Sequence, residues 1–337
     1  MLKISVIIPS YNQGKFLEET ILSVLGQEYP LLELFIIDGG SKDNSVSIIK
    51  KYEDRITGWL SEKDNGQSDA INKGFKMCTG EIVSWLGSDD LYTPGTLFKI
   101  NELFLTLPTT VGVIHGNSEI FNSDEIIRLD KGYEVWSIAR QLAGMTFPQP
   151  SSFIRKSALE QSGILNPSFH FGMDYDLFSR LIMISDFKYI DIQFSRYRLH
   201  DESKSTIAIA KFIEEWIIIF NSICEGLKLE KNIHVLEKNK LRTKTDADTF
   251  HFFSELKSIK KIDYEIMLFY FLVNVIRYDY VSENFNRVRK IGNYVSKEYG
   301  DYLKSEPLIK KVIRRTQYFP PILIKIARTT KRFLIKK

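Results

Sequence analysis

The sequence predicts an α/β unit over residues 1–205 and a helical region over 206–337, and three observations support this division. Up to residue 86, short apolar runs alternate with helical patterns, an order that gives a parallel sheet with helices on both faces. After Pro108 strand-like runs follow one another more closely, which adds a mixed part to the sheet. From about residue 205 only long helical patterns remain.

Apolar periodicity and turn residues locate the elements of the parallel part. Its strands are expected at residues 4–8, 31–37, 56–60 and 81–86, and its helices at 16–25, 43–51 and 67–77. Pro94 is expected to start a further helix, because proline is favoured in the first helical turn.

The mixed part and the helical region are less regular. The mixed part is expected to contain a meander of strands at 111–115, 119–121 and 125–129 with a hairpin turn at 122–124, short helices at 136–143 and 156–161, and a strand at 151–154. A helix opened by Asp174 and strands at 187–190 and 194–198 complete it. The helical region is expected to contain helices at 207–223, 250–256 and 262–280.

Composition excludes several classes of protein. The net charge of +4 is small for 337 residues and does not indicate a nucleic-acid-binding protein. Two distant cysteines, Cys78 and Cys224, have no metal-ligand spacing and suit a reducing compartment. The first residues lead directly into a strand without the pattern of an export signal, and no apolar run reaches the roughly 20 residues that span a bilayer. We therefore expect a cytoplasmic protein.

Polar clusters follow each strand of the parallel part, at residues 10–12, 38–43, 64–66 and 88–90. In open α/β sheets ligands bind beyond the carboxyl ends of the strands. In the last cluster, an apolar strand ends in the adjacent carboxylates Asp89 and Asp90. Their charges are costly there unless a cation is present, and Mg²⁺ or Mn²⁺ prefers carboxylate oxygens. The alternative is that residues 88–90 cap the helix begun by Pro94.

Six short motifs occur in an order that resembles glycosyltransferase family 2. They are Ser5-Val-Ile-Ile-Pro-Ser-Tyr-Asn12, Ile37-Asp-Gly-Gly-Ser-Lys-Asp43, Gly66-Gln-Ser-Asp-Ala-Ile-Asn-Lys-Gly74, Ser88-Asp-Asp90, Gly172-Met-Asp-Tyr-Asp-Leu177 and Tyr197-Arg-Leu-His200. The resemblance covers residues 3–205. It implies the GT-A fold, with a Rossmann-like nucleotide-binding half and a mixed sheet, and an enzyme that uses nucleotide sugars and inverts the anomeric centre.

The resemblance assigns donor-binding roles to residues of the first motifs. Pro9 holds the turn after the first strand, and Tyr11 stacks on the base or packs on the adjacent helix. Asp38 accepts hydrogen bonds from the ribose or from uracil, or it shapes the glycine-rich turn. Asp69 and Asn72 share a helix face and either reach the donor or remain solvated.

The later motifs carry the metal and diphosphate assignments. Ser88 belongs to the donor-binding set. Asp89 is expected to coordinate Mn²⁺ or Mg²⁺, which stabilises the leaving nucleoside diphosphate as a Lewis acid. Asp90 binds the ion, directly or through water, or holds the loop. Arg198 and His200 meet the diphosphate or the metal, unless His200 is structural.

Asp174 is the candidate general base for the acceptor hydroxyl, although aspartate at a helix start also serves as a cap. Asp176 points about 200° away around the helix, and we expect it to be structural.

The chain departs from the family pattern at four positions. Gly87 stands where relatives often carry the first carboxylate of an Asp-x-Asp triplet, so the metal would rest on fewer protein ligands. Gly39 replaces an aspartate that meets the base in some relatives. Ile71 and Met173 replace an arginine and a glutamate found in many. No Gln-x-x-Arg-Trp motif of processive synthases follows, which favours the addition of a single sugar.

The expected function is therefore a metal-dependent, inverting transfer of one sugar from a nucleotide sugar to a hydroxyl of a glycan or lipid-linked acceptor in surface polysaccharide synthesis. UDP is the favoured nucleotide. The alternative is a nucleotide-sugar-binding protein that has lost catalysis, which Gly87 makes conceivable and Asp174 opposes.

Residues 308–337 contain ten Lys or Arg and no Asp or Glu, mixed with apolar residues. This basic tail is expected to bind an anionic membrane surface at the inner face of the plasma membrane. The alternative is a solvated tail.

Overall fold

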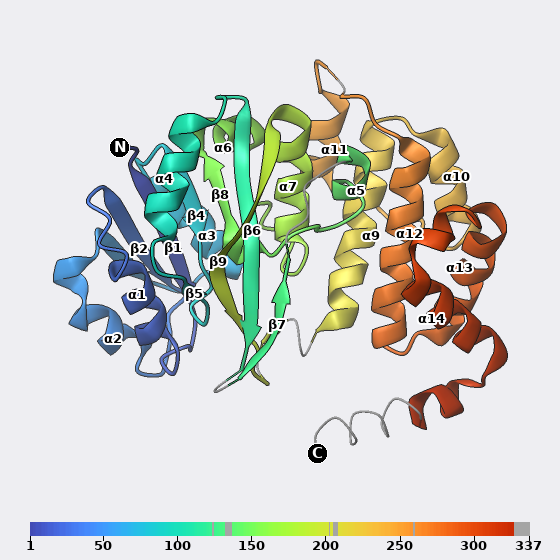
Figure 1. Cartoon of the computed structure of the whole chain (residues 1–337), viewed down its shortest axis with the longest axis horizontal. Helices are drawn as coiled ribbons and strands as arrows, with labels where there is room; N and C mark the ends of the chain where they lie inside the picture. Colours follow the sequence, from blue (N-terminus) through green and yellow to red (C-terminus); the bar gives the residue numbers. More distant parts are fainter. Residues whose placement is uncertain (123–124, 132–136, 202, 205–207, 259, 327–337) are drawn as a thin grey trace. The chain divides into compact units, whose positions relative to one another are not determined.

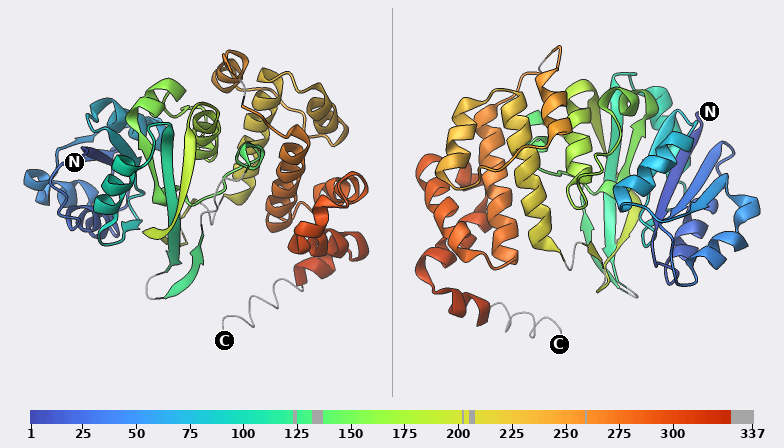
Figure 2. Two further views of the ribbon diagram at one scale, coloured as in Figure 1. Left: turned by 45° about the horizontal axis from the view of Figure 1, so that its top comes forward. Right: turned by 180° about the vertical axis from the view of Figure 1, so that it is seen from behind.

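The computed structural model describes residues 1–122, 125–131, 137–201, 203–204, 208–258 and 260–326 (Figures 1 and 2). The chain forms two compact units, one of residues 1–141 with 145–206 and the other of residues 142–144 with 207–337. The division lies next to the boundary expected at residue 205. Residues 142–144 join the helical unit, which the sequence pattern does not indicate.

The parallel part of the sheet has the expected order of strands and helices. Its strands β1 (Ile4–Ser10), β2 (Leu32–Asp38), β3 (Gly58–Ser61) and β4 (Ile82–Trp85) are ordered β3-β2-β1-β4 and are all parallel. Its connecting helices are α1 (Leu17–Leu25), α2 (Ser45–Lys51) and α3 (Gln67–Met77). The carboxyl ends of these strands therefore lie at one edge of the sheet.

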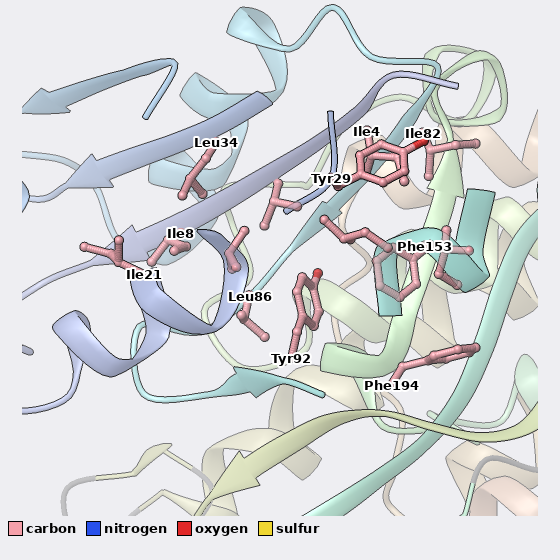
Figure 3. Close-up of a cluster of buried hydrophobic side chains, with 14 of the residues drawn as sticks. Ile4, Ile8, Ile21, Tyr29, Leu34, Ile82, Leu86, Tyr92, Phe153 and Phe194 are labelled. Carbon is pink, nitrogen blue, oxygen red and sulfur yellow. The ribbon is translucent and has the colours of Figure 1, made fainter. Parts of the chain in front are cut away.

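Alternating side chains of β1 pack on opposite faces of the sheet. Ile4 and Ile8 face a buried cluster with residues of α1, α2 and α4 (Thr96–Thr106), and Figure 3 shows Ile21, Leu34 and Leu86 in the same cluster. On the other face, α3 lies close to β1. Gly74 permits this approach, because a Cβ at that position would come within 2.6 Å of Ile7 Cγ2.

The second part of the sheet is mixed, as expected. It consists of β5 (Leu91–Tyr92), β6 (Val111–Phe121), β7 (Ile126–Asp130), β8 (Ser152–Arg155) and β9 (Asp186–Arg198). Strand β8 is antiparallel to both β4 and β6, and β9 is parallel to β6. Strand β5 pairs antiparallel with β9, and β7 pairs antiparallel with β6. The order continues from β4 as β8-β6-β9-β5, with β7 beside β6.

Two pairs of expected strands are single strands in the structure. The runs 111–115 and 119–121 form one strand, β6, and the runs 187–190 and 194–198 form β9. The residues between them do not break the strands because irregular pairing accommodates them, with register shifts on both sides of Asn117. The Asn117 side chain is itself satisfied, since its Nδ2 donates to Asp191 at 2.8 Å. The meander prediction was therefore wrong for this part.

Several expected boundaries also differ. Helix α4 begins at Thr96 after Gly95, whose φ of +79° ends the preceding loop, so Pro94 does not start it. Helix α5 is Ile138–Gln141, shorter than the expected helix at 136–143, and Trp136 lies outside the described residues. Strands β6 and β7 form the expected hairpin, while residues 123–124 of its turn are also outside them. Helices α6 (Lys156–Ser162) and α7 (Met173–Ile184) lie where expected.

The sheet curls back on itself between β4 and β5. These strands are separated by only five residues in the chain, yet β8, β6 and β9 lie between them in the sheet. Strand β5 pairs with the last part of β9, with Leu91 opposite Arg196. The link from β4 to β5, which carries Asp89 and Asp90, therefore lies beside the end of β9.

The second unit is helical. It contains α9 (Ile209–Gly226), α10 (Glu230–Lys238), α11 (Ala247–Ser254), α12 (Tyr264–Val281), α13 (Phe285–Glu298) and α14 (Pro307–Tyr318), with a short 3-10 turn at Tyr302–Ser305. Its core includes stacked rings of Phe220 and Phe271, with centroids 3.7 Å apart. Within the described parts of the chain, none of the helices combines the length and the apolar character needed to cross a bilayer.

Candidate active site

The loops after the first three strands meet at the carboxyl edge of the sheet, as expected. The Gly39 N–H donates to the Ser10 carbonyl at 2.8 Å, and the Glu62 N–H donates to the Asp38 carbonyl at 3.0 Å. The side chain of Asn12 accepts from the Lys42 N–H at 2.8 Å. These bonds hold the polar clusters in one surface region.

Tyr11 is the exposed aromatic side chain of this region. It is 59% exposed, so much of its ring remains accessible to a base. Pro9 does not lie in the turn, since β1 continues through Ser10 and Pro9 pairs in register with Ile37. It is tolerated there because β4 pairs with β1 only as far as Ile7. The neighbouring Ser10 Oγ is buried and has no hydrogen-bond partner among the described residues.

Asp38 is buried and holds the glycine-rich turn. Its Oδ2 accepts from the N–H groups of Gly40 and Ser41, at 3.1 and 2.9 Å. It also accepts from Ser61 Oγ at 2.7 Å, and Oδ1 accepts from Ser41 Oγ at 2.5 Å. This is the geometry of the turn-shaping alternative. Contact of Asp38 with a ribose or a base stays a prediction.

The two predicted residues of α3 have different surroundings. Asn72 is buried, and its side chain exchanges two hydrogen bonds with the backbone of Leu165, at 2.8 and 3.0 Å. The amide is thus not solvated, since it is bonded to the backbone of Leu165. Contact of Asn72 with the donor stays a prediction. Asp69 is partly exposed and accepts from the Asn65 N–H at 3.0 Å. Its role remains a prediction.

Residues Gly87 to Asp90 form a tight turn, in which the Asp90 N–H donates to the Gly87 carbonyl at 3.0 Å. Strand β5 follows directly, and no side chain caps α4, so the helix-capping alternative for residues 88–90 was wrong. Ser88 is buried in the turn. A Cβ at Gly87 would lie 2.8 Å from Asp90 Oδ2 and 2.9 Å from Asp89 Oδ1. Because Gly87 has no side chain, the carboxylates of Asp89 and Asp90 can occupy the space beside it.

Asp89 and His200 form a pair, with Oδ2 and Nε2 2.8 Å apart. Their side chains are 24% and 13% exposed, so the pair is accessible at the surface. The ring of Phe16 packs against His200, with centroids 4.7 Å apart, and the His200 N–H donates to Ser203 Oγ at 3.1 Å. Because β5 pairs with the end of β9, the sheet brings together two predicted metal ligands, Asp89 before β5 and His200 after β9.

Asp90 is buried behind this pair. Its Oδ1 accepts from the Arg198 N–H at 3.0 Å. Burial, and then the neighbouring Asp89 charge, raises the pKa of Asp90 well above its usual value. These contacts agree with the loop-holding alternative for Asp90. Direct binding of a metal by Asp90 stays a prediction.

Arg198 is also buried, and its side chain is used within the protein. Its Nε donates to the Asp89 carbonyl at 2.9 Å, and its Nη2 pairs with Glu19 at 2.5 Å. These contacts argue against the expected role of Arg198 as a ligand of the diphosphate.

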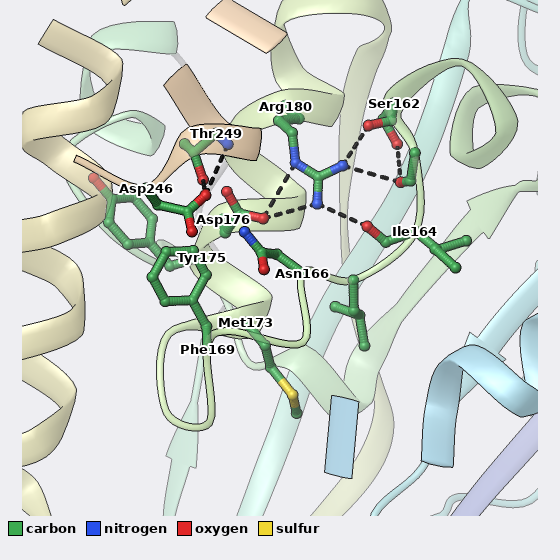
Figure 4. Close-up of polar contacts among 12 residues, drawn as sticks. Ser162, Ile164, Asn166, Phe169, Met173, Tyr175, Asp176, Arg180, Asp246 and Thr249 are labelled. Atoms are coloured by element: carbon green, nitrogen blue, oxygen red, sulfur yellow. Dashed lines mark hydrogen bonds and ion pairs between the residues drawn. The ribbon is translucent and has the colours of Figure 1, made fainter. Parts of the chain in front are cut away.

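Asp174 lies in the first turn of α7 and is partly exposed, and its Oδ1 accepts from the Tyr175 N–H at 2.7 Å. Asp176 is buried in an ion pair with Arg180, whose guanidinium also donates to backbone carbonyls of residues 162–164 (Figure 4). Arg180 thus ties α7 to the end of α6 and the loop after it, and Asp176 is its ion-pair partner within α7. Asp174 remains the candidate base.

The donor set fits a divalent cation that is shared with a phosphate. The described residues contain no group of three His, Cys, Asp or Glu that could enclose a metal. Mg²⁺ and similar ions are commonly held by one or two protein carboxylates together with substrate phosphates. Asp89 supplies one such carboxylate, and the adjacent imidazole of His200 could supply a nitrogen ligand. Both are accessible, whereas a closed structural site would need more ligands.

The structure adds residues that sequence reasoning missed. Phe16 and Glu19 of the α1 region contact His200 and Arg198, although they belong to no recognised motif. Their spacing of three indicates a shared helix face but does not reveal a partner about 180 residues further along the chain. Ser10 lies within the first motif, and its buried hydroxyl becomes visible only in the fold.

Comparisons with known proteins show what this chain is similar to. A family model described as glycosyl transferase family 2 matches residues 5–173. The UDP-Glc:α-D-GlcNAc-diphosphoundecaprenol β-1,3-glucosyltransferase WfgD of Escherichia coli is 27% identical over 64% of this chain and 85% of that protein. Uncharacterised glycosyltransferases of Rickettsia also match. The chain spans 74% of the length of the one from Rickettsia typhi but 39% of the one from Rickettsia conorii.

Solved structures share the fold. S. aureus TarS 1–349 in complex with UDP-GlcNAc aligns with a TM-score of 0.58 and 16% identity, over 93% of this chain and 90% of that chain. The mannosyltransferase PcManGT from Pyrobaculum calidifontis, in complex with GDP-Man and Mn²⁺, aligns with a TM-score of 0.51 and 17% identity, over 100% of this chain and 88% of that chain. The expected GT-A fold is thereby confirmed.

Proposed function

This chain belongs to glycosyl transferase family 2 and is a glycosyltransferase, and from that premise we propose a specific reaction. It transfers one sugar from a nucleotide sugar to a hydroxyl of a glycan or lipid-linked acceptor, with inversion and with a divalent metal ion. The observation that carries this proposal is the accessible Asp89–His200 pair, which the fold assembles at the carboxyl edge of the sheet beside the loop of Tyr11.

Donor binding is assigned to the loops after β1 and β2. The exposed ring of Tyr11 provides a flat surface for a base, and the turn held by Asp38 borders it through the Gly39–Ser10 bond. UDP is the favoured nucleotide, which is in line with the UDP-GlcNAc complex of the TarS structure. Asp69 and Ser88 belong to the same proposed region.

The proposed metal ligands are Asp89 and His200, with Asp90 in support. When bound, Mn²⁺ or Mg²⁺ supplies Lewis-acid stabilisation of the charge on the departing nucleoside diphosphate. The mannosyltransferase structure, which shares the fold, contains Mn²⁺, and this supports the proposed use of a metal ion. Asp89 and His200 orient the diphosphate side of the donor, which leaves the opposite side of the sugar for the acceptor.

Asp174 is the proposed general base. Its carboxylate takes the proton of the acceptor hydroxyl while that oxygen forms a bond to the anomeric carbon. The bond from the anomeric carbon to the diphosphate oxygen breaks on the opposite side, so the configuration inverts and the nucleoside diphosphate leaves with the electron pair. Its position in the first turn of α7 keeps the side chain partly exposed.

A catalytically inactive nucleotide-sugar-binding protein is the second candidate, and Gly87 is the observation that favours it. The packing at Gly87 weakens this alternative. Asp89 and Asp90 already occupy the space that a side chain would take, so the turn presents Asp89 without a third carboxylate.

The acceptor is proposed to be lipid-linked and the protein to act at the cytoplasmic face of a membrane. The Escherichia coli relative is named for a diphosphoundecaprenol-linked acceptor, which supports a lipid-linked acceptor for this chain.

Helix α14 buries Ile309 and Ile313 and exposes four basic residues, namely Lys310, Lys311, Arg314 and Arg315. Exposed apolar side chains follow at Tyr318, Phe319, Ile322, Leu323 and Ile326. This mixture suits an anionic membrane surface. Residues 327–337 of the predicted tail lie outside the described residues.

A thermal-shift experiment tests the donor and metal parts together. UDP with Mn²⁺ is expected to raise the melting temperature, since a ligand at 100 times its Kd stabilises the folded state by about 2.7 kcal/mol. UDP with EDTA should give a smaller shift, and Asp89→Ala should remove the difference between the two. If no nucleotide changes the melting temperature with or without Mn²⁺, the proposed reaction is wrong.

Liposome flotation tests the membrane part. Full-length protein should float with vesicles that contain anionic lipid and not with neutral vesicles. Replacement of the four basic residues of α14 by glutamine should weaken binding by about 1 kcal/mol for each charge removed near the surface. Equal flotation of both proteins with anionic vesicles would rule out this role of α14.

A further inference from the structure

Arg198 contacts the turn that carries Asp89 and Asp90 through both its backbone and its side chain. Its N–H donates to Asp90 Oδ1 at 3.0 Å, and its Nε donates to the Asp89 carbonyl at 2.9 Å. A change in the position of this one residue would therefore affect both the backbone of Asp89 and the side chain of Asp90.

The guanidinium of Arg198 is itself fixed from three sides. It lies over the rings of Phe16 and Phe121, with its carbon 5.0 and 4.4 Å from their centroids. Its Nη2 pairs with Glu19 on α1 at 2.5 Å. The planar fork of arginine can satisfy these contacts together, whereas the point charge of lysine cannot. The side chain is buried as a result.

Phe16 connects this arrangement to the second predicted metal ligand. Its ring packs against His200 at 4.7 Å between centroids, while it also faces Arg198. Phe16 immediately precedes α1 and follows the loop that carries Tyr11. The same segment therefore supports both members of the Asp89–His200 pair.

We propose that Arg198 is a positioning residue for the metal pair. Together with Phe16, Glu19 and Phe121 it forms what we call the Arg198 clamp, which fixes Asp89 opposite His200. In this role Arg198 does not bind the diphosphate. The inference rests on the proposed binding of metal by Asp89 and His200, and it adds the residues that make this two-ligand site rigid enough to bind.

The contacts of Arg198 favour this role over binding of the diphosphate. Its Nε and Nη2 already donate to Asp89 and Glu19, and aromatic rings cover the guanidinium. Contact of Nε or Nη2 with a phosphate would require breaking the bond to Asp89 or the ion pair with Glu19, and exposing a buried side chain. As a support of a metal ligand, Arg198 needs no rearrangement.

The test uses the 337-residue chain and measures two quantities. The first is the Mn²⁺ concentration at which the Mn²⁺-dependent increase in UDP binding is half complete. The second is the affinity for UDP in the presence of EDTA. Arg198→Lys should raise the first by about 10- to 100-fold, as loss of a group that orients a metal ligand typically does. Glu19→Gln should raise it by less, up to about fivefold, because the Glu19 side chain is 57% exposed and water screens its charge. Neither should change the UDP affinity in EDTA.

Arg196→Lys is the matched control. Arg196 lies two residues earlier on β9, pairs with Glu119 at 2.7 Å and also lies over Phe121, at 4.3 Å, but the contacts described for it do not include the Gly87–Asp90 turn. The control should leave the Mn²⁺ dependence unchanged. Circular dichroism verifies folding of each variant, and Glu19→Gln decides the question if Arg198→Lys does not fold.

The outcomes separate the inference from the proposed function. If wild-type protein binds UDP equally well with Mn²⁺ and EDTA, the metal role fails and the inference fails with it. If wild-type binding needs Mn²⁺ but both clamp variants retain the wild-type Mn²⁺ dependence, only the inference is overturned. If Arg198→Lys weakens UDP binding equally in EDTA, Arg198 is a diphosphate ligand and the clamp is rejected.

Discussion

Two pairs of a carboxylate with a basic side chain in the first unit differ in exposure and in their partners, and the difference distinguishes a candidate ligand-binding site from a structural ion pair. Asp89 and His200 come from positions 111 residues apart and are 24% and 13% exposed. Asp176 and Arg180 are one helical turn apart, and their side chains are 1% and 7% exposed. Arg180 also bonds to three backbone carbonyls, so the chain itself satisfies this pair. Accessibility and remaining binding capacity, more than the presence of charge, mark the candidate site.

The largest effect is expected for Asp89→Ala. Loss of a metal ligand should reduce sugar transfer by about 10³- to 10⁴-fold, since metal stabilisation of the leaving group amounts to several kcal/mol. Because the pair is partly exposed, the free energy of unfolding should change by about 1 kcal/mol or less. Donor-turnover assays with Mn²⁺ and urea unfolding measure the two effects. Asp54→Ala, an exposed aspartate elsewhere, is the control, and full activity of Asp89→Ala would refute the metal role.

Asp176→Asn should show the reverse pattern. It leaves Arg180 buried without its ion pair, which typically destabilises a protein by about 3–5 kcal/mol. Binding of UDP and Mn²⁺ should persist in the fraction that remains folded. Urea unfolding and titration calorimetry measure this, with Glu102→Gln in the exposed Lys99–Glu102 pair as the control. A variant that stays fully stable but loses activity would contradict the comparison.

Asp174→Asn should lose activity without losing the donor site. A positioned general base contributes at least about 10²-fold, so transfer should fall by that factor while the affinity for UDP and Mn²⁺ stays the same. Single-turnover assays and UDP titration measure the two quantities. Asp248→Asn is a matched control, because Asp248 also lies in the first turn of a helix. Unchanged turnover would remove Asp174 as the base.

The smallest effect is expected for Gly87→Ala. The new Cβ would meet both carboxylates at less than 3 Å, so the turn must shift and the affinity for Mn²⁺ should fall by about tenfold. Gly58→Ala is the control, since a Cβ there would make only ordinary contacts at 3.6 Å. Mn²⁺ titration of UDP binding compares the two variants. An equal affinity in both would mean that the turn does not need the space at Gly87.

The parallel half of the sheet was predictable because its signals are local. Apolar strands, their turn residues and helix periodicity lie next to each other in the chain, so β1 to β4 and the polar edge follow from the sequence. The mixed half was predicted less well. Gly116, Asn117 and Ser118 look like a break, and only cross-strand bonds such as Asn117–Asp191 show that β6 continues through them.

The candidate site was predictable as a set of motifs but not as a set of contacts. The motifs named Asp89 and His200, and the fold brings them together. The sequence does not indicate that the Asn72 side chain bonds to the backbone of Leu165, or that Arg198 contacts Glu19 and two aromatic rings. Such pairings depend on which distant segments become neighbours, and no local pattern encodes that.

The long strand β9 has a consequence for how this protein is made. The strands that carry the loops of Tyr11, Asp38 and Asp89 precede β9 in the chain, and His200 takes its place only when β9 has paired with β6. Contacts of such long sequence separation form slowly. A chain that stops before the end of β9 would therefore lack the Asp89–His200 pair, and a stop before Phe194 would also remove a ring from the buried cluster of the parallel half. Completion of the pair thus coincides with completion of the sheet.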